Sequence, residues 1–446
     1  MRRFVLSAVL LFAAQASSAF ARDANRPLLR VMPEDPNGVY KAAQEVRFLI
    51  TLPKDGAPKE GTGVDCVIKD DCGAVVWKGR VAAQGGEPLV ARAKLDRPGV
   101  LRCKVTLRFD ANTVLSAEAG AAVDPFQIKA GMAPPDDFDA FWAAQKKKLA
   151  AVEMKPEMTP IEFPTKGVEC FDVQVPCVGD KPTSGRYARP AGAKPKSLPA
   201  VLYVQGAGFY SAWIGTPASA AATGMIAMEI NAHGIPNGKP KSYYQELGKA
   251  ELAEYRIRGI ESRETWYFLG MYLRLARALD FLAAQPEWDG KVLMVVGSSQ
   301  GGSQAIAAAG LDPRVTAIVA NVPGHCDLAP GLPGRVPGWP VGVALSAQKR
   351  RDEKIVASVR YYDSANFAAR TKADVLLIVG LIDDTCPPAG VLAAYNNFAG
   401  NKEIMIRPGM GHATPPGYEQ IVRKFLAERR GTRDRGPGNG EVHTRP

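Results

Sequence analysis

The chain has 446 residues, of which 46% are hydrophobic and 23% charged, and this composition excludes a wholly disordered chain, a collagen-like repeat and a polytopic membrane protein. The length predicts two or three domains, and seven cysteines are too few to build the fold on disulfides, so hydrophobic cores must stabilise it. The net charge of +11 is thinly spread apart from the two ends, with no long Lys/Arg run, so we expect no nucleic-acid binding.

Residues 1–21 predict a secretory signal peptide. Met1-Arg2-Arg3 is a short positive segment, residues 4–14 are apolar, and Ala19-Phe20-Ala21 has the small-x-small pattern of a cleavage site. The apolar run is well short of the ~20 residues that span a bilayer, so we expect no stable membrane insertion. A buried N-terminal helix is the alternative. The agreement of charge, length and cleavage site favours a secreted or periplasmic protein.

An odd number of cysteines leaves at least one of them free or shared between chains. A pair among Cys66, Cys72 and Cys103 is compatible with their closeness in sequence, but the sequence does not fix the pairing. There is no Cys-x-x-Cys motif and the chain has only four histidines, so we expect no metal site.

Residues 22–130 predict a small β-sandwich domain of immunoglobulin-like size. Short alternating segments at 46–52, 64–69, 74–78 and 101–107 are separated by Gly, Pro and Asp turns, and no helical period occurs. Two functions are compatible with such a module, namely carbohydrate binding, or packing and positioning without a ligand. We favour the second, because the sequence identifies no exposed aromatic platform.

Residues 131–430 predict an α/β domain. A helix over 138–151 begins after Asp136 or Asp137, either of which can cap it, and residues 168–177 alternate as a strand. Near-continuous apolar runs, typical of buried parallel strands, follow at 200–204, 225–230, 292–296, 316–320, 375–379 and 403–406. Helical segments such as 265–285 alternate with them, which predicts a mostly parallel sheet. Residues 431–446 lack apolar periodicity and predict a disordered tail.

Ser299 is the candidate nucleophile. It is the only serine in a Gly-x-Ser-x-Gly pattern, Gly297-Ser298-Ser299-Gln300-Gly301, which follows the strand 292–296 and precedes a helix-forming run over 303–309. This context is that of a nucleophile elbow, a sharp turn that exposes the serine hydroxyl. A structural glycine-rich turn is the alternative, which the strand before and the helix after disfavour.

His412 is the candidate base by elimination. His443 lies in the predicted tail, His233 precedes the serine, and His325 lies close behind the strand 316–320. His412 follows the last predicted strand, and the chain order Ser, Asp, His is that of α/β-hydrolases. We interpret His233 and His325 as loop residues that line the pocket.

Asp383 is the candidate acid that orients the histidine. It follows the strand 375–379 at its carboxyl end, between the nucleophile and the histidine in the chain. Its neighbour Asp384 is the alternative, or else a cap for the following helix. The backbone N–H groups of Gln300 and Ala207 are the candidate oxyanion donors. Aromatic residues that follow Ala207 are candidate walls of a substrate-binding acyl pocket, although ordinary packing explains them equally well: Phe209, Tyr210 and Trp213.

Taken together, these motifs resemble the acetyl xylan esterase / cephalosporin-C deacetylase family over roughly residues 131–430. The matching segments are Asp137-Phe138-Asp139-Ala140-Phe141-Trp142, the elbow 297–302, and the segments 311–315, 361–368 and 380–388. The resemblance implies an α/β-hydrolase fold, the triad Ser299, Asp383 and His412, and an acetylated poly- or oligosaccharide as substrate.

Three family motifs differ in this chain. The family's Arg-Gly-Gln, His-Gly-Tyr and His-Glu are replaced by Ala232-His233-Gly234, Gln205-Gly206-Ala207 and His412-Ala413. The differences surround the triad, so the resemblance implies the reaction class and leaves the substrate open.

The sequence therefore predicts a serine esterase that removes acetyl groups from carbohydrate without a cofactor. The alternatives are another serine hydrolase of this fold, such as a peptidase or a general carboxylesterase, and a non-catalytic sugar-binding protein. The sequence leaves the oligomeric state open.

Overall fold

The computed structural model describes residues 28–53, 63–82, 89–109, 112–331, 334–341, 352–430 and 443–444. The predicted signal peptide lies outside these residues, as does the predicted tail except for His443–Thr444, which forms β18 beside β17. Among the helices within the described ranges, none has the length and apolar character needed to cross a membrane. All seven cysteines are free thiols, so the pairing that the sequence allowed among Cys66, Cys72 and Cys103 is not formed.

Two sheets form the N-terminal module. The strands are β1 (Arg30–Pro33), β2 (Val39–Tyr40), β3 (Val46–Thr51), β4 (Gly63–Asp70), β5 (Val75–Ala82), β6 (Leu89–Ala93), β7 (Gly99–Arg108) and β8 (Val114–Val123). They pair in the orders β1-β3-β6 and β2-β8-β7-β4-β5. Side chains from both sheets, among them Phe48, Ile68 and Val105, form one buried cluster. Because alternate residues of each inner strand face this cluster, the alternating segments of the sequence become its strands.

A second, larger sheet forms the centre of the molecule. Its strands are β9 (Glu157–Pro160), β10 (Val168–Val175), β11 (Thr183–Pro190), β12 (Leu198–Val204), β13 (Ile226–Ile230), β14 (Trp288–Ser298), β15 (Ala317–Asn321), β16 (Asp374–Gly380), β17 (Lys402–Arg407) and β18. The order is β18-β17-β16-β15-β14-β12-β13-β11-β10-β9. Strands from β13 to β18 pair in parallel, whereas β9, β10 and β11 extend the sheet antiparallel. The mostly parallel sheet agrees with the predicted fold class.

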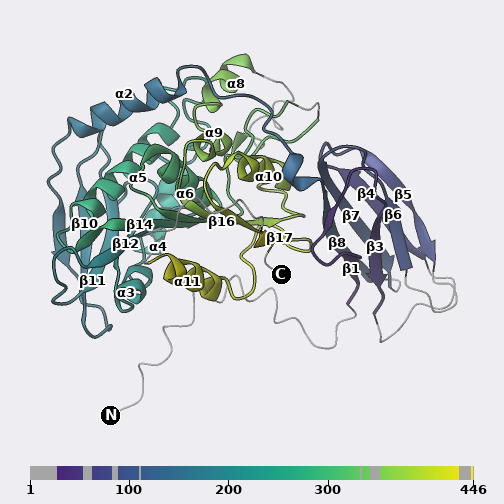
Figure 1. Cartoon of the computed structure of the whole chain (residues 1–446), viewed down its shortest axis with the longest axis horizontal. Coiled ribbons are helices and arrows are strands. Elements are labelled where there is room, and N and C mark those ends of the chain that lie inside the picture. The colour runs from purple at the N-terminus through teal and green to yellow at the C-terminus, as the bar shows by residue number, and fades with distance from the viewer. Residues whose placement is uncertain are drawn as a thin grey trace, which may run out of the picture.

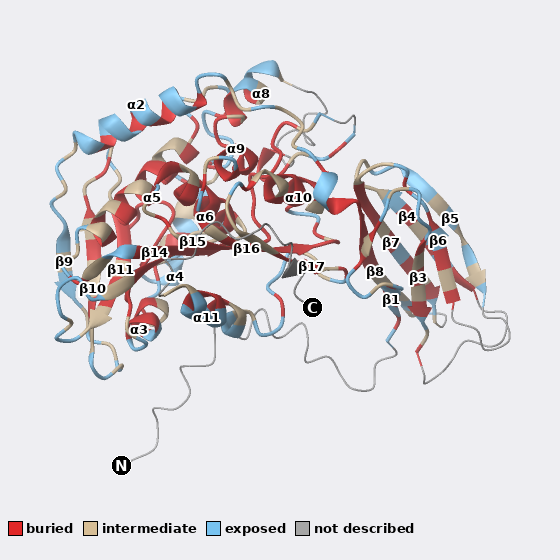
Figure 2. Cartoon of the chain, in the orientation of Figure 1, coloured by how far each residue is buried: buried red, intermediate tan, exposed pale blue. Residues whose placement is uncertain are grey.

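Helices cover both faces of this sheet (Figure 1). One face carries α3 (Gly215–Ala221) and α11 (Tyr418–Arg429). The opposite side carries α2 (Phe138–Ala150), α5 (Phe268–Ala283), α6 (Gln300–Leu311), α9 (Ser364–Ala368) and α10 (Pro388–Asn397). Two further helices are α4 (Lys241–Lys249) and α8 (Glu353–Val359). Figure 2 shows that burial is concentrated in the central strands and the helices that flank them.

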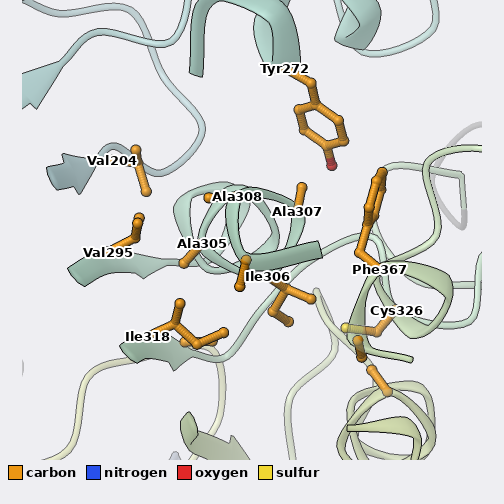
Figure 3. Close-up of a cluster of buried hydrophobic side chains, with 14 of the residues drawn as sticks. Val204, Tyr272, Val295, Ala305, Ile306, Ala307, Ala308, Ile318, Cys326 and Phe367 are labelled. Atoms are coloured by element: carbon orange, nitrogen blue, oxygen red, sulfur yellow. The ribbon is translucent and has the colours of Figure 1, made fainter. Parts of the chain in front are cut away.

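Helix α6 lies in the middle of the larger core. Its residues Ala305–Ala309 are buried, and in Figure 3 the helix residues Ala305 to Ala308 lie between strand residues such as Val295 and Ile318 and the rings of Tyr272 and Phe367. Small side chains let the helix approach the sheet closely. This packing fixes the start of α6, where the serine elbow lies.

Asp137 occupies the cap position of α2, but its side chain makes no capping hydrogen bond. The carboxylate instead pairs with Arg263 and accepts from the Tyr361 hydroxyl. The predicted helix is therefore correct, and the capping role that the sequence suggested for Asp137 is wrong, because a cation and a phenol compete for the same oxygens.

The module lies beside the carboxyl ends of β16 and β17, where the Gly120 N–H of β8 donates to the Pro408 carbonyl (Figure 1). Val100 of β7 and Ala122 of β8 belong to the same buried cluster as the core of the α/β domain. The connecting segment includes a short 3-10 helix, Pro125–Gln127, and the side-chain amide of Asn396 on α10 donates to the carbonyls of Pro125 at 2.9 Å and Ile128 at 2.7 Å. The two parts are thus packed together and tied at their junction.

Candidate active site

The predicted elbow lies between β14 and α6. Ser299 has φ 60° and ψ −122°, a strained conformation for a residue with a side chain. Its N–H donates to the Asn321 carbonyl at 2.9 Å, and its carbonyl accepts from the Gly324 N–H at 3.0 Å. These bonds to the end of β15 and to the loop after it hold the strained turn, so the hydroxyl projects from the carboxyl end of the sheet.

The two glycines of the elbow allow close backbone approach. A Cβ on Gly297 would lie 2.2 Å from the Gly301 carbonyl oxygen, and a Cβ on Gly301 would lie 2.3 Å from the Val204 carbonyl oxygen. Atoms at these distances overlap, so any side chain would force β14, α6 and β12 apart.

We therefore expect Gly301→Ala to destabilise the fold by about 1–3 kcal/mol, the usual cost of overpacking, and to reduce activity by displacing Ser299. Urea unfolding of the variant measures this. Gly409→Ala is the control, since its Cβ would approach nothing closer than the Met32 sulfur at 3.5 Å. Equal midpoints for the two variants would contradict the steric explanation.

The structure brings Ser299, His412 and Asp383 into one hydrogen-bonded line. His412 Nε2 lies 2.8 Å from Ser299 Oγ, and His412 Nδ1 lies 2.8 Å from Asp383 Oδ2. The carboxylate makes Nδ1 the protonated nitrogen, which leaves Nε2 free to accept the serine proton. Asp383 is 4% exposed, and its other oxygen accepts from the N–H groups of Thr385 and Cys386, each at 2.8 Å. The carboxylate is thus fixed in orientation before it meets the imidazole.

Asp384, the alternative acid, points elsewhere. Its side chain is 78% exposed and forms an ion pair with Arg102 of β7. It does not cap the following helix either, because α10 has Pro387 at its cap position. Of the two neighbouring aspartates, only Asp383 reaches His412.

The other described imidazoles are buried in aromatic surroundings. His325 is fully buried, stacks on Trp266 and hydrogen-bonds the Tyr272 hydroxyl at 3.0 Å. His233 hydrogen-bonds the Tyr267 hydroxyl at 2.9 Å and the Gly208 carbonyl at 3.1 Å. Burial lowers the pKa of each to about 3, so both stay neutral. They are packed in the interior, and the side chain of His443 lies outside the described residues.

The loop after β12 passes beside the nucleophile. A Cβ on Gly206 would lie 3.7 Å from the Ser299 Cβ, and Gln300 is the first residue of α6. Both predicted oxyanion donors, Ala207 and Gln300, are therefore in segments next to the serine. Their role stays a prediction, as it depends on a bound substrate.

Two residues that brace these donors were not singled out from the sequence. Glu229, at the end of β13, is buried and accepts from the Gln205 side-chain amide at 2.8 Å and the Trp213 N–H at 2.9 Å. Burial raises the pKa of Glu229. The Tyr255 hydroxyl donates to the Gln300 side-chain oxygen at 2.8 Å. The sequence does mark Glu229, because it is the one charged residue of an otherwise apolar strand. No feature of the sequence marks Tyr255.

The three predicted pocket aromatics have different surroundings. Phe209 packs against the rings of His233 and Tyr255, at centroid distances of 5.2 and 5.6 Å. The Tyr210 hydroxyl donates to the Gly206 carbonyl at 3.1 Å. Trp213 is 62% exposed and contacts Phe163. These contacts are with the protein's own loop and surface, so a role in binding an acyl group stays a prediction for all three.

Among the described residues, two clusters have ligand atoms close enough for a metal ion: Asp383, Cys386 and His412, and Asp70, Asp71 and Cys72. In the first, Asp383 and His412 bond to each other, and burial raises the pKa of Cys386 well above its ordinary value, so the thiol keeps its proton. In the second, Arg97 pairs with both aspartates. We assign neither cluster to a metal.

Comparison with known proteins agrees with this geometry. Residues 127–429 match the family described as Acetyl xylan esterase (AXE1). The acetyl esterase Axe7A of Xylanibacter ruminicola is 28% identical over 399 residues, which cover 88% of each chain. The solved acetyl xylan esterase from Paenibacillus sp. R4 is 27% identical with a TM-score of 0.60, over 68% of this chain and 98% of that one.

A second solved structure, acetyl xylan esterase 1 from Thermoanaerobacterium sp. JW/SL YS485, is 24% identical with a TM-score of 0.57, over 68% of this chain and 97% of that one. Its likeness supports the α/β-hydrolase fold. The family match spans more than half of the chain and includes the elbow, the acid loop and the histidine loop. This protein therefore belongs to the acetyl xylan esterase family and is a carboxylic ester hydrolase.

Proposed function

We propose that the chain is a secreted or periplasmic serine esterase that removes O-acetyl groups from carbohydrate through an acyl-enzyme. The observation that carries this proposal is the line from Ser299 Oγ through His412 to Asp383, with 2.8 Å at each step. Localisation rests on the sequence of residues 1–21 alone.

In the first half of the reaction, Ser299 Oγ attacks the ester carbonyl while His412 Nε2 takes its proton. The Asp383 carboxylate stabilises the imidazolium through its hydrogen bond with Nδ1. The negative oxygen of the tetrahedral intermediate accepts from the N–H groups of Gln300 and Ala207. The C–O bond to the sugar then breaks, and His412 returns the proton to the departing sugar hydroxyl.

The second half repeats these steps with water. His412 removes a proton from water, the resulting hydroxide attacks the acetyl-serine carbonyl, and the same donors hold the oxyanion. Collapse releases acetate and restores the serine hydroxyl. Every proton moves through His412 Nε2, so these side chains and water suffice.

The family supports an acetylated poly- or oligosaccharide as the substrate, since the solved relative from Paenibacillus sp. R4 is an acetyl xylan esterase. A panel of p-nitrophenyl esters, an aminoacyl anilide and acetylated xylan separates this from the alternatives. We expect hydrolysis of short esters and release of acetate from xylan. Cleavage of the anilide alone would indicate a peptidase, and no turnover at all would indicate a binding protein.

We also expect selectivity for small acyl groups. If the aromatic loop closes around a two-carbon acyl group, each added methylene costs ~1–3 kcal/mol of fit, so kcat/KM for the acetate ester should exceed that for butyrate by at least about tenfold. Measuring kcat/KM for p-nitrophenyl acetate, butyrate and octanoate tests this. A flat or rising profile with chain length would instead indicate a general carboxylesterase.

A further inference from the structure

We propose that the β module positions the active site: β7 and β8 hold the two loops that carry Asp383 and His412. Within this contact, Arg102 is a positioning residue for Asp383. The proposal rests on the proposed function, since it assumes that these two residues act on Ser299.

The first contact is made by Arg102, which projects from β7 onto the acid loop. Its guanidinium hydrogen-bonds both oxygens of Asp384, with 2.9 Å from Nη2 to Oδ2. On its other side, Nε donates to Glu118 of β8 at 2.6 Å. Arg102 thus joins the module to the residue next to Asp383, in a two-pronged geometry that fixes direction as well as distance. The same bonds lower the pKa of Asp384.

The second contact is made by the backbone of β8. The Gly120 N–H donates to the Pro408 carbonyl at 2.8 Å, at the start of the loop that carries His412. A Cβ on Gly120 would lie 2.5 Å from the Cβ of Leu381, which begins the acid loop. One residue of β8 therefore touches both catalytic loops.

The two loops are also joined to each other. The Leu381 N–H donates to the Arg407 carbonyl at 3.0 Å, and the Ile382 N–H donates to the Met410 carbonyl at 3.2 Å. Any displacement of the acid loop by the module is consequently passed to the histidine loop.

A cavity of about 550 Å³ lies between the module and the acid loop, lined by residues of both parts, including Lys69, Glu118, Leu381 and Asp383. Leu381 and Asp383 themselves are buried, whereas the neighbouring Asp384 is 78% exposed. At Asp384 the acid loop is therefore held by the ion pair with Arg102 more than by packing.

The energy of the ion pair favours a positioning role over a stabilising one. With Asp384 78% exposed, the pair is screened by solvent and contributes at most about 1 kcal/mol to stability. Its loss would scarcely affect folding. A displacement of about 1 Å in a catalytic group, by contrast, costs up to about a hundredfold in rate.

The test uses the whole chain and p-nitrophenyl acetate, a substrate too small to need the cavity. We expect Arg102→Met to lower kcat by about 10- to 100-fold with KM unchanged within about twofold. Arg102→Lys should recover part of the loss, because lysine restores the charge but not the two-pronged bond. The control is Arg92→Met, which removes an exposed ion pair with Glu45 elsewhere on the module and should leave kcat and KM unchanged.

The decisive arm repeats Arg102→Met in an Asp383→Asn background. If Arg102 acts through Asp383, Arg102→Met should change kcat by less than about twofold in the Asp383→Asn background. If the two residues act independently, the losses in kcat from the two substitutions should multiply. Three results would overturn the proposal: equal losses in both backgrounds, a kcat unchanged by Arg102→Met, or an effect confined to KM for acetylated xylan, which would make Arg102 a substrate-binding residue. If Asp383→Asn alone keeps full activity, the proposed triad fails instead, and thermal unfolding of each variant shows whether it is folded.

Discussion

Replacing Ser299 or His412 by alanine should lower kcat for p-nitrophenyl acetate by about four to six orders of magnitude. Triad residues act as a unit, so losing the nucleophile or the base removes nearly all covalent catalysis and leaves only what the oxyanion donors and binding provide. The two atoms lie 2.8 Å apart, which is hydrogen-bond distance for the proton transfer that the reaction needs. Steady-state kinetics with each variant measures the loss.

The matched control for the serine is Ser303→Ala, one turn along α6, where the hydroxyl donates to the Gln300 carbonyl within the helix. It should keep turnover within about tenfold of the parent. Thermal unfolding should show that both alanine variants of the triad are folded. Near-parent turnover in either one would refute the assignment of Ser299 and His412.

The second large effect separates two adjacent aspartates. Asp383→Asn should lower kcat by about 10³- to 10⁴-fold, because an amide at this position can donate to Nδ1 and so favours the wrong imidazole tautomer, as in serine proteases. Asp384→Asn removes one side of the ion pair with Arg102 and leaves Asp383 bonded to His412, so its effect should be far smaller.

Asparagine is nearly isosteric with aspartate, so both variants should fold, and their kinetics can be compared directly. The ratio of their kcat values is the measurement. A larger loss for Asp384→Asn would mean that the catalytic acid is one residue further along the acid loop than the static hydrogen bonds indicate.

Much of the central sheet was predictable because buried parallel strands need apolar residues on both faces. The run 375–379 lies within β16, and 292–296 within β14. The elbow was predictable for a different reason: Gly297 and Gly301 meet backbone at 2.2 and 2.3 Å, a constraint that no other residue type satisfies. Because the chain has only four histidines, elimination was enough to assign His412 as the base, and the structure places its Nε2 2.8 Å from Ser299 Oγ.

Strand β8 was missed, because its Ala, Gly and Ser residues have little intrinsic preference for strands and become one only by pairing along the whole of β7. Arg102 was missed for a related reason. It is an ordinary outward residue of an alternating strand, and its partner Asp384 is 282 residues away in sequence. Contacts of this kind depend on how two preformed surfaces meet, which local patterns do not encode.

The buried cluster that Val100 and Ala122 share with the α/β core, together with the anchored junction at Asn396, has a consequence for the folding of the chain. A binding module joined to its neighbour by a flexible linker unfolds independently. It can be removed while the neighbouring domain stays folded. Here we expect the two parts to unfold as one cooperative unit, with a single calorimetric transition. A fragment that begins after the module would expose to water the apolar surface of its own core that packs around Val100 and Ala122.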